Sequence, residues 1–133
     1  MRGVNGIALI VIGLLHSLAL VIPGAIGFQG IWSEIRRTGV IDAVSGSSGA
    51  NLRVWGYYWF LIPGFMLIIL GMLCAWVERS VQRSVPAFVG WALLAFCAFA
   101  ILPDTGTGFW LVVAVAFSMM FAAKREAPRG SAV

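Results

Sequence analysis

Four runs of apolar residues alternate with short polar segments along this chain. The runs cover residues 4–28, 55–77, 86–102 and 108–123. A helix needs about 20 apolar residues, within a range of roughly 17 to 25, to cross the ~30 Å hydrocarbon core of a bilayer. The first two runs meet this length, and tryptophan and basic side chains at the ends of the short fourth run can extend its reach. The pattern predicts an all-α fold, an integral membrane four-helix bundle.

The bundle is expected to form a single transmembrane domain over residues 1–123, followed by a flexible cytoplasmic tail over residues 124–133. The first run could instead be a signal peptide, since Arg2 precedes it and small residues close it. Its apolar part is longer than the roughly 7 to 15 residues of such a segment, and three further runs follow. A retained span is therefore the preferred interpretation.

A short helix is predicted in the polar segment between the first two runs. Residues 30–38 read GIWSEIRRT and place Ile31, Trp32 and Ile35 on one side, with polar side chains opposite. Such a pattern suits a helix that lies in the outer membrane interface.

Individual residues predict where a loop lies and where two of the helices begin. Residues 45–51, SGSSGAN, are typical of a flexible loop. Pro86 suits the first turn of the third helix, and Thr107 suits the N-cap of the fourth.

The composition agrees with a membrane protein. Hydrophobic residues make up 61% of the chain and charged residues 11%, whereas an ordinary soluble domain is about 25% charged. The mean hydropathy is +0.98. In water the excess apolar surface would form aggregating patches, so a lipid bilayer is the expected partner.

The net charge of +4 is unevenly distributed. Six basic residues flank one side of a four-span arrangement, namely Arg2, Arg79, Arg83, Lys124, Arg125 and Arg129. Only Arg36, Arg37 and Arg53 lie on the other side. The positive-inside bias therefore predicts a multi-pass protein of the bacterial cytoplasmic (inner) membrane with both termini in the cytoplasm. No nucleic-acid partner is expected, because no basic groove carries interleaved aromatic residues.

Small residues recur every seven positions in the first run, at Gly6, Gly13 and Gly27, with Leu20 in the same register. Gly64 and Gly71 have the same spacing in the second run. Small residues let helix backbones approach closely, which is a main source of packing energy in lipid. Both stripes should therefore face protein, and a homodimer is a further expectation.

His16 is the one histidine of the chain and lies in an uncharged run. An ionisable side chain at mid-membrane depth is costly and marks a candidate functional site. The structural alternative is a neutral imidazole that hydrogen-bonds Ser17, a tyrosine, or the Trp59 carbonyl left without an N–H partner by Pro63. No cofactor is predicted, although axial ligation of a haem by His16 stays open. The chain shows no metal-ligand spacing and no C-x-x-C.

The aromatic residues that open the second run form another candidate site. The candidate ligand-binding residues are Trp32, Tyr57, Tyr58 and Trp59. Such residues usually form an interface belt. Because adjacent helix positions cover all faces, one or two of them should point inward and line a pocket open to the outer leaflet.

Several segments together resemble a family of small four-span bacterial membrane proteins that carries only a domain-of-unknown-function label. They are GLLHSLALVIPG, RTGVIDAV, YYWF and LPDTGTGFWL. The resemblance covers nearly the whole chain apart from the tail. It implies four membrane helices and a histidine in the first of them, here His16, and it implies no activity.

Three classes of function fit these features. The preferred one is a non-enzymatic membrane protein that binds a hydrophobic small molecule or a lipid in the outer-leaflet pocket. The second is an intramembrane acid/base enzyme of isomerase, epoxide-opening or terpene-cyclase type, with His16 and Asp104 as catalytic residues. The third is a small multidrug-type exporter. It is weakened because drug/proton exchange needs an acid within the membrane, and all five acids lie at the ends of runs.

Overall fold

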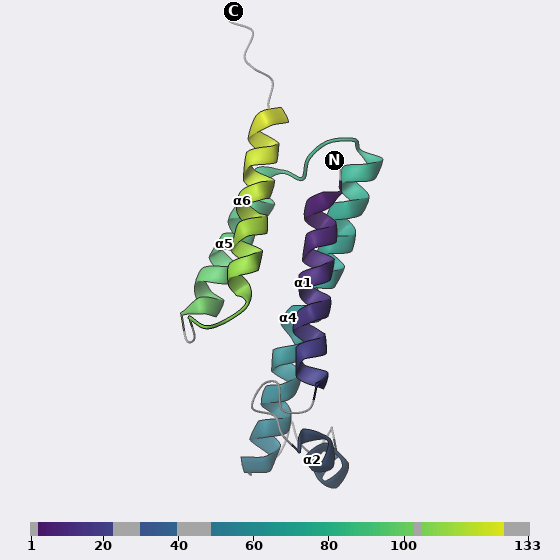
Figure 1. Ribbon diagram of the computed structural model, residues 1–133, viewed down its shortest axis with the longest axis vertical. Helices are drawn as coiled ribbons and strands as arrows, with labels where there is room; N and C mark the ends of the chain where they lie inside the picture. The colour runs from purple at the N-terminus through teal and green to yellow at the C-terminus, as the bar shows by residue number, and fades with distance from the viewer. Residues whose placement is uncertain (1–2, 23–29, 40–48, 103–104, 127–133) are drawn as a thin grey trace, which may run out of the picture. The chain divides into compact units, whose positions relative to one another are not determined.

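The computed structural model describes residues 3–22, 30–39, 49–102 and 105–126. Within these ranges the chain forms five helices and no strand, which confirms the all-α class (Figure 1). The helices are α1 (Val4–Val21), α2 (Ile31–Thr38), α4 (Gly49–Ser80), α5 (Ala87–Ile101) and α6 (Phe109–Glu126).

Two helices are long and apolar enough to cross a membrane. They are α1 and the part of α4 from Leu52 to Ser80. α5 is apolar but has 15 residues, about 22 Å at 1.5 Å per residue. Only 22% of the residues in the α1 window and 28% of those in the α4 window are buried. The two helices therefore present most of their apolar surface outward, unlike the core helix of a soluble domain.

The helix ends differ from the predicted ones in several places. α1 ends at Val21, two residues before Pro23, because proline disfavours helical conformation in the residue that precedes it. α4 already begins at Gly49, so the predicted loop is wrong for residues 49–51. Pro86 is the N-cap of α5 with φ −55° and ψ 142°, rather than a residue of its first turn. α6 continues to Glu126, three residues beyond the end of the predicted span.

The short helix α2 confirms the prediction for residues 30–38. Its ends are set by two glycines, Gly30 with φ 75° and Gly39 with φ 71°. Side chains other than glycine rarely adopt this left-handed conformation, so these residues interrupt the helix on both sides.

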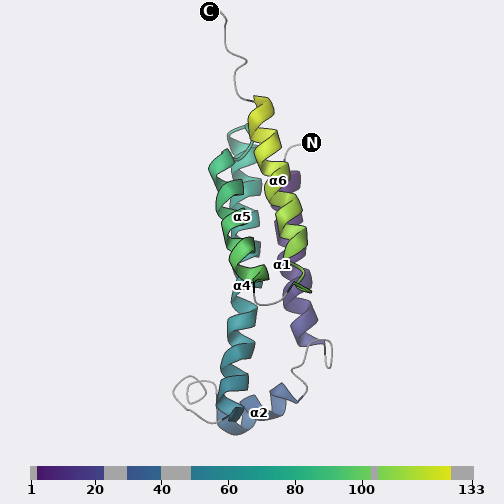
Figure 2. The same cartoon turned by 90° about the vertical axis from the view of Figure 1, so that its left-hand side faces the viewer.

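The structure divides into two compact units. Unit 1 comprises residues 1–12 and 68–133, and contains the start of α1, the end of α4, α5 and α6. In it α5 and α6 lie side by side (Figures 1 and 2). A Cβ atom added to Gly90 of α5 would lie 2.8 Å from the Ala116 carbonyl oxygen of α6, which shows how closely these helices approach.

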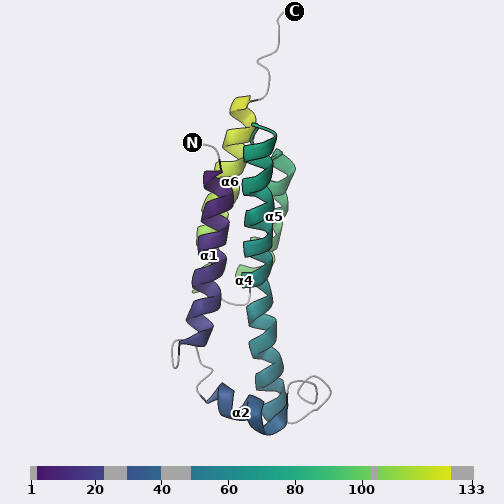
Figure 3. The ribbon, with the colours of Figure 1, turned by 90° about the vertical axis from the view of Figure 1, so that its right-hand side faces the viewer.

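In unit 1 the start of α1 lies beside the end of α4 (Figure 3), and glycines form their contact. A Cβ atom on Gly71 would lie 2.6 Å from the carbonyl oxygen of Gly6 and 2.8 Å from the backbone nitrogen of Ile10. Around this contact the buried core includes Leu9 and Cys74.

Unit 2 comprises residues 13–67, and contains the end of α1, α2 and the start of α4. α2 lies crosswise to the axis of α4 (Figures 2 and 3). The buried cluster of this unit consists of Leu20, Ile31, Val54 and Tyr57, one or more from each helix. Ile35, Tyr58 and Leu61 pack against it.

Both seven-residue stripes are buried where the structure describes them. Gly6, Gly13 and Leu20 of α1 are buried, as are Gly64 and Gly71 of α4. The prediction that these faces meet protein is confirmed for these residues. Gly27 lies outside the described ranges.

Candidate functional site

His16 is half-buried in unit 2 and interacts with α4. Its Nε2 atom lies 2.8 Å from the carbonyl oxygen of Phe60. A carbonyl only accepts hydrogen bonds, so Nε2 carries the proton in this contact. The imidazole also stacks on the Phe60 ring, with 5.4 Å between ring centroids and 7° between ring planes. The acceptor residue lies three positions before Pro63. The sequence had instead suggested the carbonyl of the adjacent Trp59, which Pro63 leaves without an N–H partner.

Close approach of the two helices brings His16 to Phe60. A Cβ atom on Gly64 would lie 3.1 Å from His16 Cδ2 and 3.2 Å from the carbonyl oxygen of Gly13, and it would overlap the Ser17 hydroxyl. The missing side chain at position 64 is therefore what leaves room for the imidazole. The Ser17 hydroxyl is buried without a hydrogen-bond partner among the residues described.

Three of the four candidate ligand-binding aromatics come together in unit 2. Tyr57 is buried, with 2% of its surface exposed. Its ring meets Trp32 edge-on at a centroid distance of 6.1 Å and Tyr58 at 5.9 Å. Trp59 lies elsewhere and pairs with Trp55 at 5.4 Å.

Three tryptophans of unit 2 are partly exposed. Trp32, Trp55 and Trp59 are exposed over 49%, 42% and 54% of their surfaces. Trp32 therefore lies only partly on the buried face of α2. Ile31, which lies on that face, is 2% exposed. Of the three tryptophans, Trp32 meets the buried Tyr57, whereas Trp55 and Trp59, two positions on either side of Tyr57, project from another face of α4.

An ion pair links α2 to α4 beside the aromatic cluster. Arg53 Nη1 donates to Glu34 Oε1 at 2.7 Å. The other two basic residues of this region, Arg36 and Arg37, are exposed in the last turn of α2. The exposed aromatic surface therefore has positively charged residues next to it on the same helix as Trp32.

Asp104, the proposed catalytic acid, lies outside the described residues, as do Pro103 and Asp42. The described residues that follow it form a structured entry to α6. The Phe109 N–H donates to Thr107 Oγ1 at 3.3 Å. Because α6 begins at Phe109, Thr107 lies one position before the N-cap that the sequence predicted it to be. Trp110 Nε1 donates to the Thr105 carbonyl at 2.9 Å.

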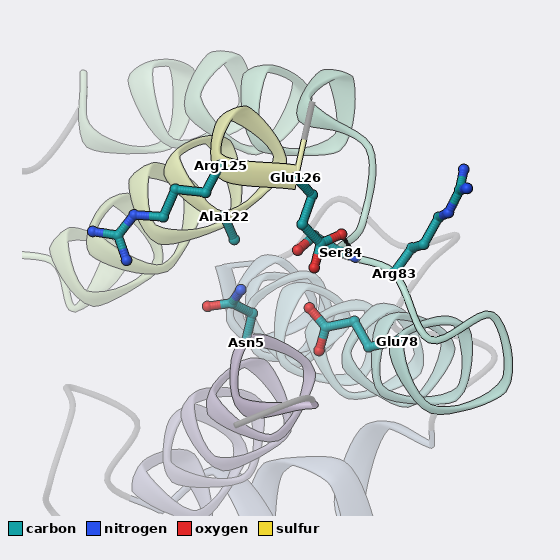
Figure 4. A pocket seen from close by; sticks show the side chains of 7 residues that line it. All are labelled: Asn5, Glu78, Arg83, Ser84, Ala122, Arg125 and Glu126. Carbon is teal, nitrogen blue, oxygen red and sulfur yellow. Dashed lines mark hydrogen bonds between the residues drawn. The ribbon is translucent and has the colours of Figure 1, made fainter. Parts of the chain in front are cut away.

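A polar cavity in unit 1 was not predicted from the sequence. Its volume is about 280 Å³, and Figure 4 shows the side chains that line it. The polar residues around it are Asn5, Glu78, Arg83, Ser84, Arg125 and Glu126. They come from the start of α1, the end of α4, the connection that follows α4, and the end of α6.

Glu78 is the unusual member of this set, since 5% of its surface is exposed. Its Oε2 atom is buried and has no hydrogen-bond partner among the described residues. The sequence held a signal for it, because Gly64, Gly71 and Glu78 continue one seven-residue spacing. The face that buries the two glycines therefore also buries this carboxylate.

Local hydrogen bonds position the other lining groups. The Ser84 N–H donates to Glu126 Oε2 at 2.6 Å, which ties the α4–α5 connection to the end of α6. The Ser118 hydroxyl donates to Asn5 Oδ1 at 2.8 Å, which ties α6 to the start of α1. Both contacts hold the walls of the cavity in place.

Comparison with known proteins identifies the family of the chain. A family model described as "Family of unknown function (DUF6463)" matches residues 1–126. The chain belongs to the DUF6463 family. No curated protein and no solved structure gave a match. The resemblance inferred from the sequence, a family with a domain-of-unknown-function label, is confirmed, and the DUF6463 match covers all the described helices.

Proposed function

We propose that this DUF6463 protein is a four-span protein of the bacterial cytoplasmic membrane that binds a lipid or another hydrophobic small molecule in the outer leaflet. In this proposal α1, α4, α5 and α6 are the spans, and both termini are cytoplasmic. Unit 2 carries the ligand surface.

The exposed apolar surface supports the membrane part of the proposal. Large apolar side chains point outward on α5 and α6 as well as on the two candidate spans, for example Phe99, which is 77% exposed, and Phe121, which is 62% exposed. A soluble monomer rarely exposes a large contiguous apolar surface, whereas lipid solvates one. α4 has 32 residues, about 48 Å of helix. It can therefore cross the ~30 Å core and still extend into the interface at its start.

One observation carries the ligand part of the proposal, namely the half-exposed Trp32 against the buried Tyr57, with the half-exposed pair of Trp55 and Trp59 on the same segment of α4. Rigid aromatic rings offer a large contact area at a small cost in conformational entropy. Arg36 and Arg37 of α2 add positive charge beside them. A lipid with an anionic headgroup fits both features, since its acyl chains would lie against the rings and its headgroup near the arginines.

Photo-crosslinking in nanodiscs tests this proposal. The protein is reconstituted with a trace of phosphatidylglycerol that carries a photoactivatable acyl chain, and the labelled peptides are identified by mass spectrometry. We expect labelling concentrated on α2 and on residues 52–61, with competition by unlabelled phosphatidylglycerol. The variants Trp32→Ala and Trp59→Ala should reduce it severalfold.

Trp91→Ala is the matched control, because Trp91 is a similarly exposed tryptophan, 62%, on α5 of unit 1. This variant should leave labelling of unit 2 unchanged. Uniform labelling of every exposed tryptophan, without competition, would show only annular lipid and would refute the proposed site.

A further inference from the structure

The cavity of unit 1 places two carboxylates against the same space. Glu78 projects from α4 and Glu126 from the end of α6, and Figure 4 shows both carboxylate groups directed toward the interior of the cavity. The Glu126 carboxylate is anchored by the Ser84 N–H. Two carboxylates that share a site repel each other unless positive charge lies between them.

Burial makes the Glu78 carboxylate costly in particular. An ionised carboxylate removed from water is strongly destabilising unless it is paired and hydrogen-bonded. Glu78 has neither an ion pair nor a hydrogen bond within the described part of the chain. The site thus provides negative charge whose natural complement is a cation.

The arginines of the cavity do not pair with Glu78. Arg83 and Arg125 contribute to the cavity wall, but Figure 4 shows their guanidinium groups directed away from the Glu78 carboxylate. Arg79, one residue after Glu78, has its Nε atom near Gly3 instead, 3.4 Å from where a Cβ atom of that glycine would lie.

From this geometry we infer that the unit 1 cavity binds a small organic cation with a primary ammonium group, held between Glu78 and Glu126. An ammonium has three N–H donors and no acceptor, and the two carboxylates offer acceptor oxygens from two sides. The half-buried Ala122 gives an apolar wall for the alkyl part of the ligand. A cavity of about 280 Å³ accommodates a molecule of a few carbon atoms.

A metal ion fits this cavity less well. Ca²⁺ takes six to eight oxygen ligands and Mg²⁺ demands near-ideal octahedral geometry. No group of three or more histidine, cysteine, aspartate or glutamate side chains gathers as a metal site among the described residues. The inference concerns unit 1 alone, so failure of lipid binding to unit 2 would leave it standing.

Isothermal titration of the detergent-purified full chain tests the inference with n-butylammonium chloride as the probe. Tetramethylammonium chloride, which has no N–H donor, serves as the comparison cation. We expect saturable binding of butylammonium and at least tenfold weaker binding of tetramethylammonium. Glu78→Gln and Glu126→Gln should each weaken butylammonium binding about tenfold or more, the usual range for a hydrogen bond to a charged group.

Glu34→Gln is the matched control, because it removes a carboxylate of unit 2 and should leave the affinity unchanged. Glu126 is exposed at the end of α6, so Glu126→Gln decides the question if Glu78→Gln does not fold. Three results would overturn the inference: no saturable butylammonium binding, equal affinity for both cations, or tighter binding of Mg²⁺ or Na⁺ that depends on Glu78.

Discussion

His16 Nε2 and the Phe60 carbonyl oxygen lie 2.8 Å apart, and this hydrogen bond crosses from α1 to α4 within unit 2. It joins the one histidine of the chain to the helical turn that contains Pro63. The hydrogen bond and the stacked Phe60 ring account for an imidazole within an apolar helix. These contacts stabilise the packing of the two helices and require no catalytic or ligand-binding role of His16.

The first prediction concerns this pair. Replacing His16 by Ala removes the hydrogen bond and the ring contact, and we expect a loss of about 1–2 kcal/mol in the free energy of unfolding. His16→Gln, which keeps a donor, should recover part of it. The measurement is a denaturant titration of the reconstituted protein, followed by lipid crosslinking. A His16→Ala protein of unchanged stability that no longer crosslinks lipid would instead assign His16 a role in ligand binding.

The second prediction compares two glycines of α4. At Gly71 a Cβ atom would lie 2.6 Å from the Gly6 carbonyl oxygen, whereas at Gly56 nothing lies within 4 Å. Alanine favours a helix over glycine by up to about 1 kcal/mol, while overpacking costs about 1–3 kcal/mol. Gly56→Ala should therefore stabilise the protein slightly and Gly71→Ala should destabilise it. Thermal unfolding measures both, and equal shifts would contradict the packed α1–α4 contact of unit 1.

The third prediction separates apolar from ionic docking of α2. Ile31 is buried in the unit 2 cluster, so Ile31→Ala should cost about 2–4 kcal/mol in stability. The ion pair is partly exposed, with 43% of the Arg53 side chain and 19% of the Glu34 side chain accessible, and such a pair contributes about 1 kcal/mol. Arg53→Gln should therefore destabilise the protein less than Ile31→Ala. Limited proteolysis in the α2 region provides the readout, and greater cleavage in Arg53→Gln than in Ile31→Ala would reverse this ranking.

The fourth prediction concerns the two thiols. Cys74 and Cys97 are free and buried, so a maleimide should label neither in the folded protein and both after denaturation in SDS. Ser80→Cys places a thiol at the exposed end of α4 and is the positive control. Rapid labelling of the native protein without this substitution would show that the interior of unit 1 opens.

The same thiol chemistry tests the membrane orientation. In a background with Cys74 and Cys97 replaced by alanine, single cysteines are introduced at Ser33 of α2 and at Ser80. With both termini cytoplasmic, a membrane-impermeant maleimide added to intact spheroplasts should label Ser33→Cys and spare Ser80→Cys. The opposite pattern would invert the proposed topology.

Several features followed from the sequence because they depend on local patterns. Apolar runs and their polar breaks predicted all-α structure, and the pattern of residues 30–38 predicted α2. Seven-residue spacing predicted which faces of α1 and α4 are buried, since helical geometry alone places such residues on one side. The early start of α4 escaped prediction because residues 45–51 are rich in glycine and serine, which have low helix propensity.

The surroundings of the candidate functional residues depended on which helices pack together. Glu78 lies at the end of an apolar run, where an acidic side chain is expected to meet water. Packing of α1, α4 and α6 in unit 1 instead buries it beside Glu126. In the same way, the rotation of α4 decides that Tyr57 faces the α2 cluster while Trp59 joins Trp55. Periodicity determines which residues share a helix face, but only the packing of segments far apart in sequence determines what that face meets.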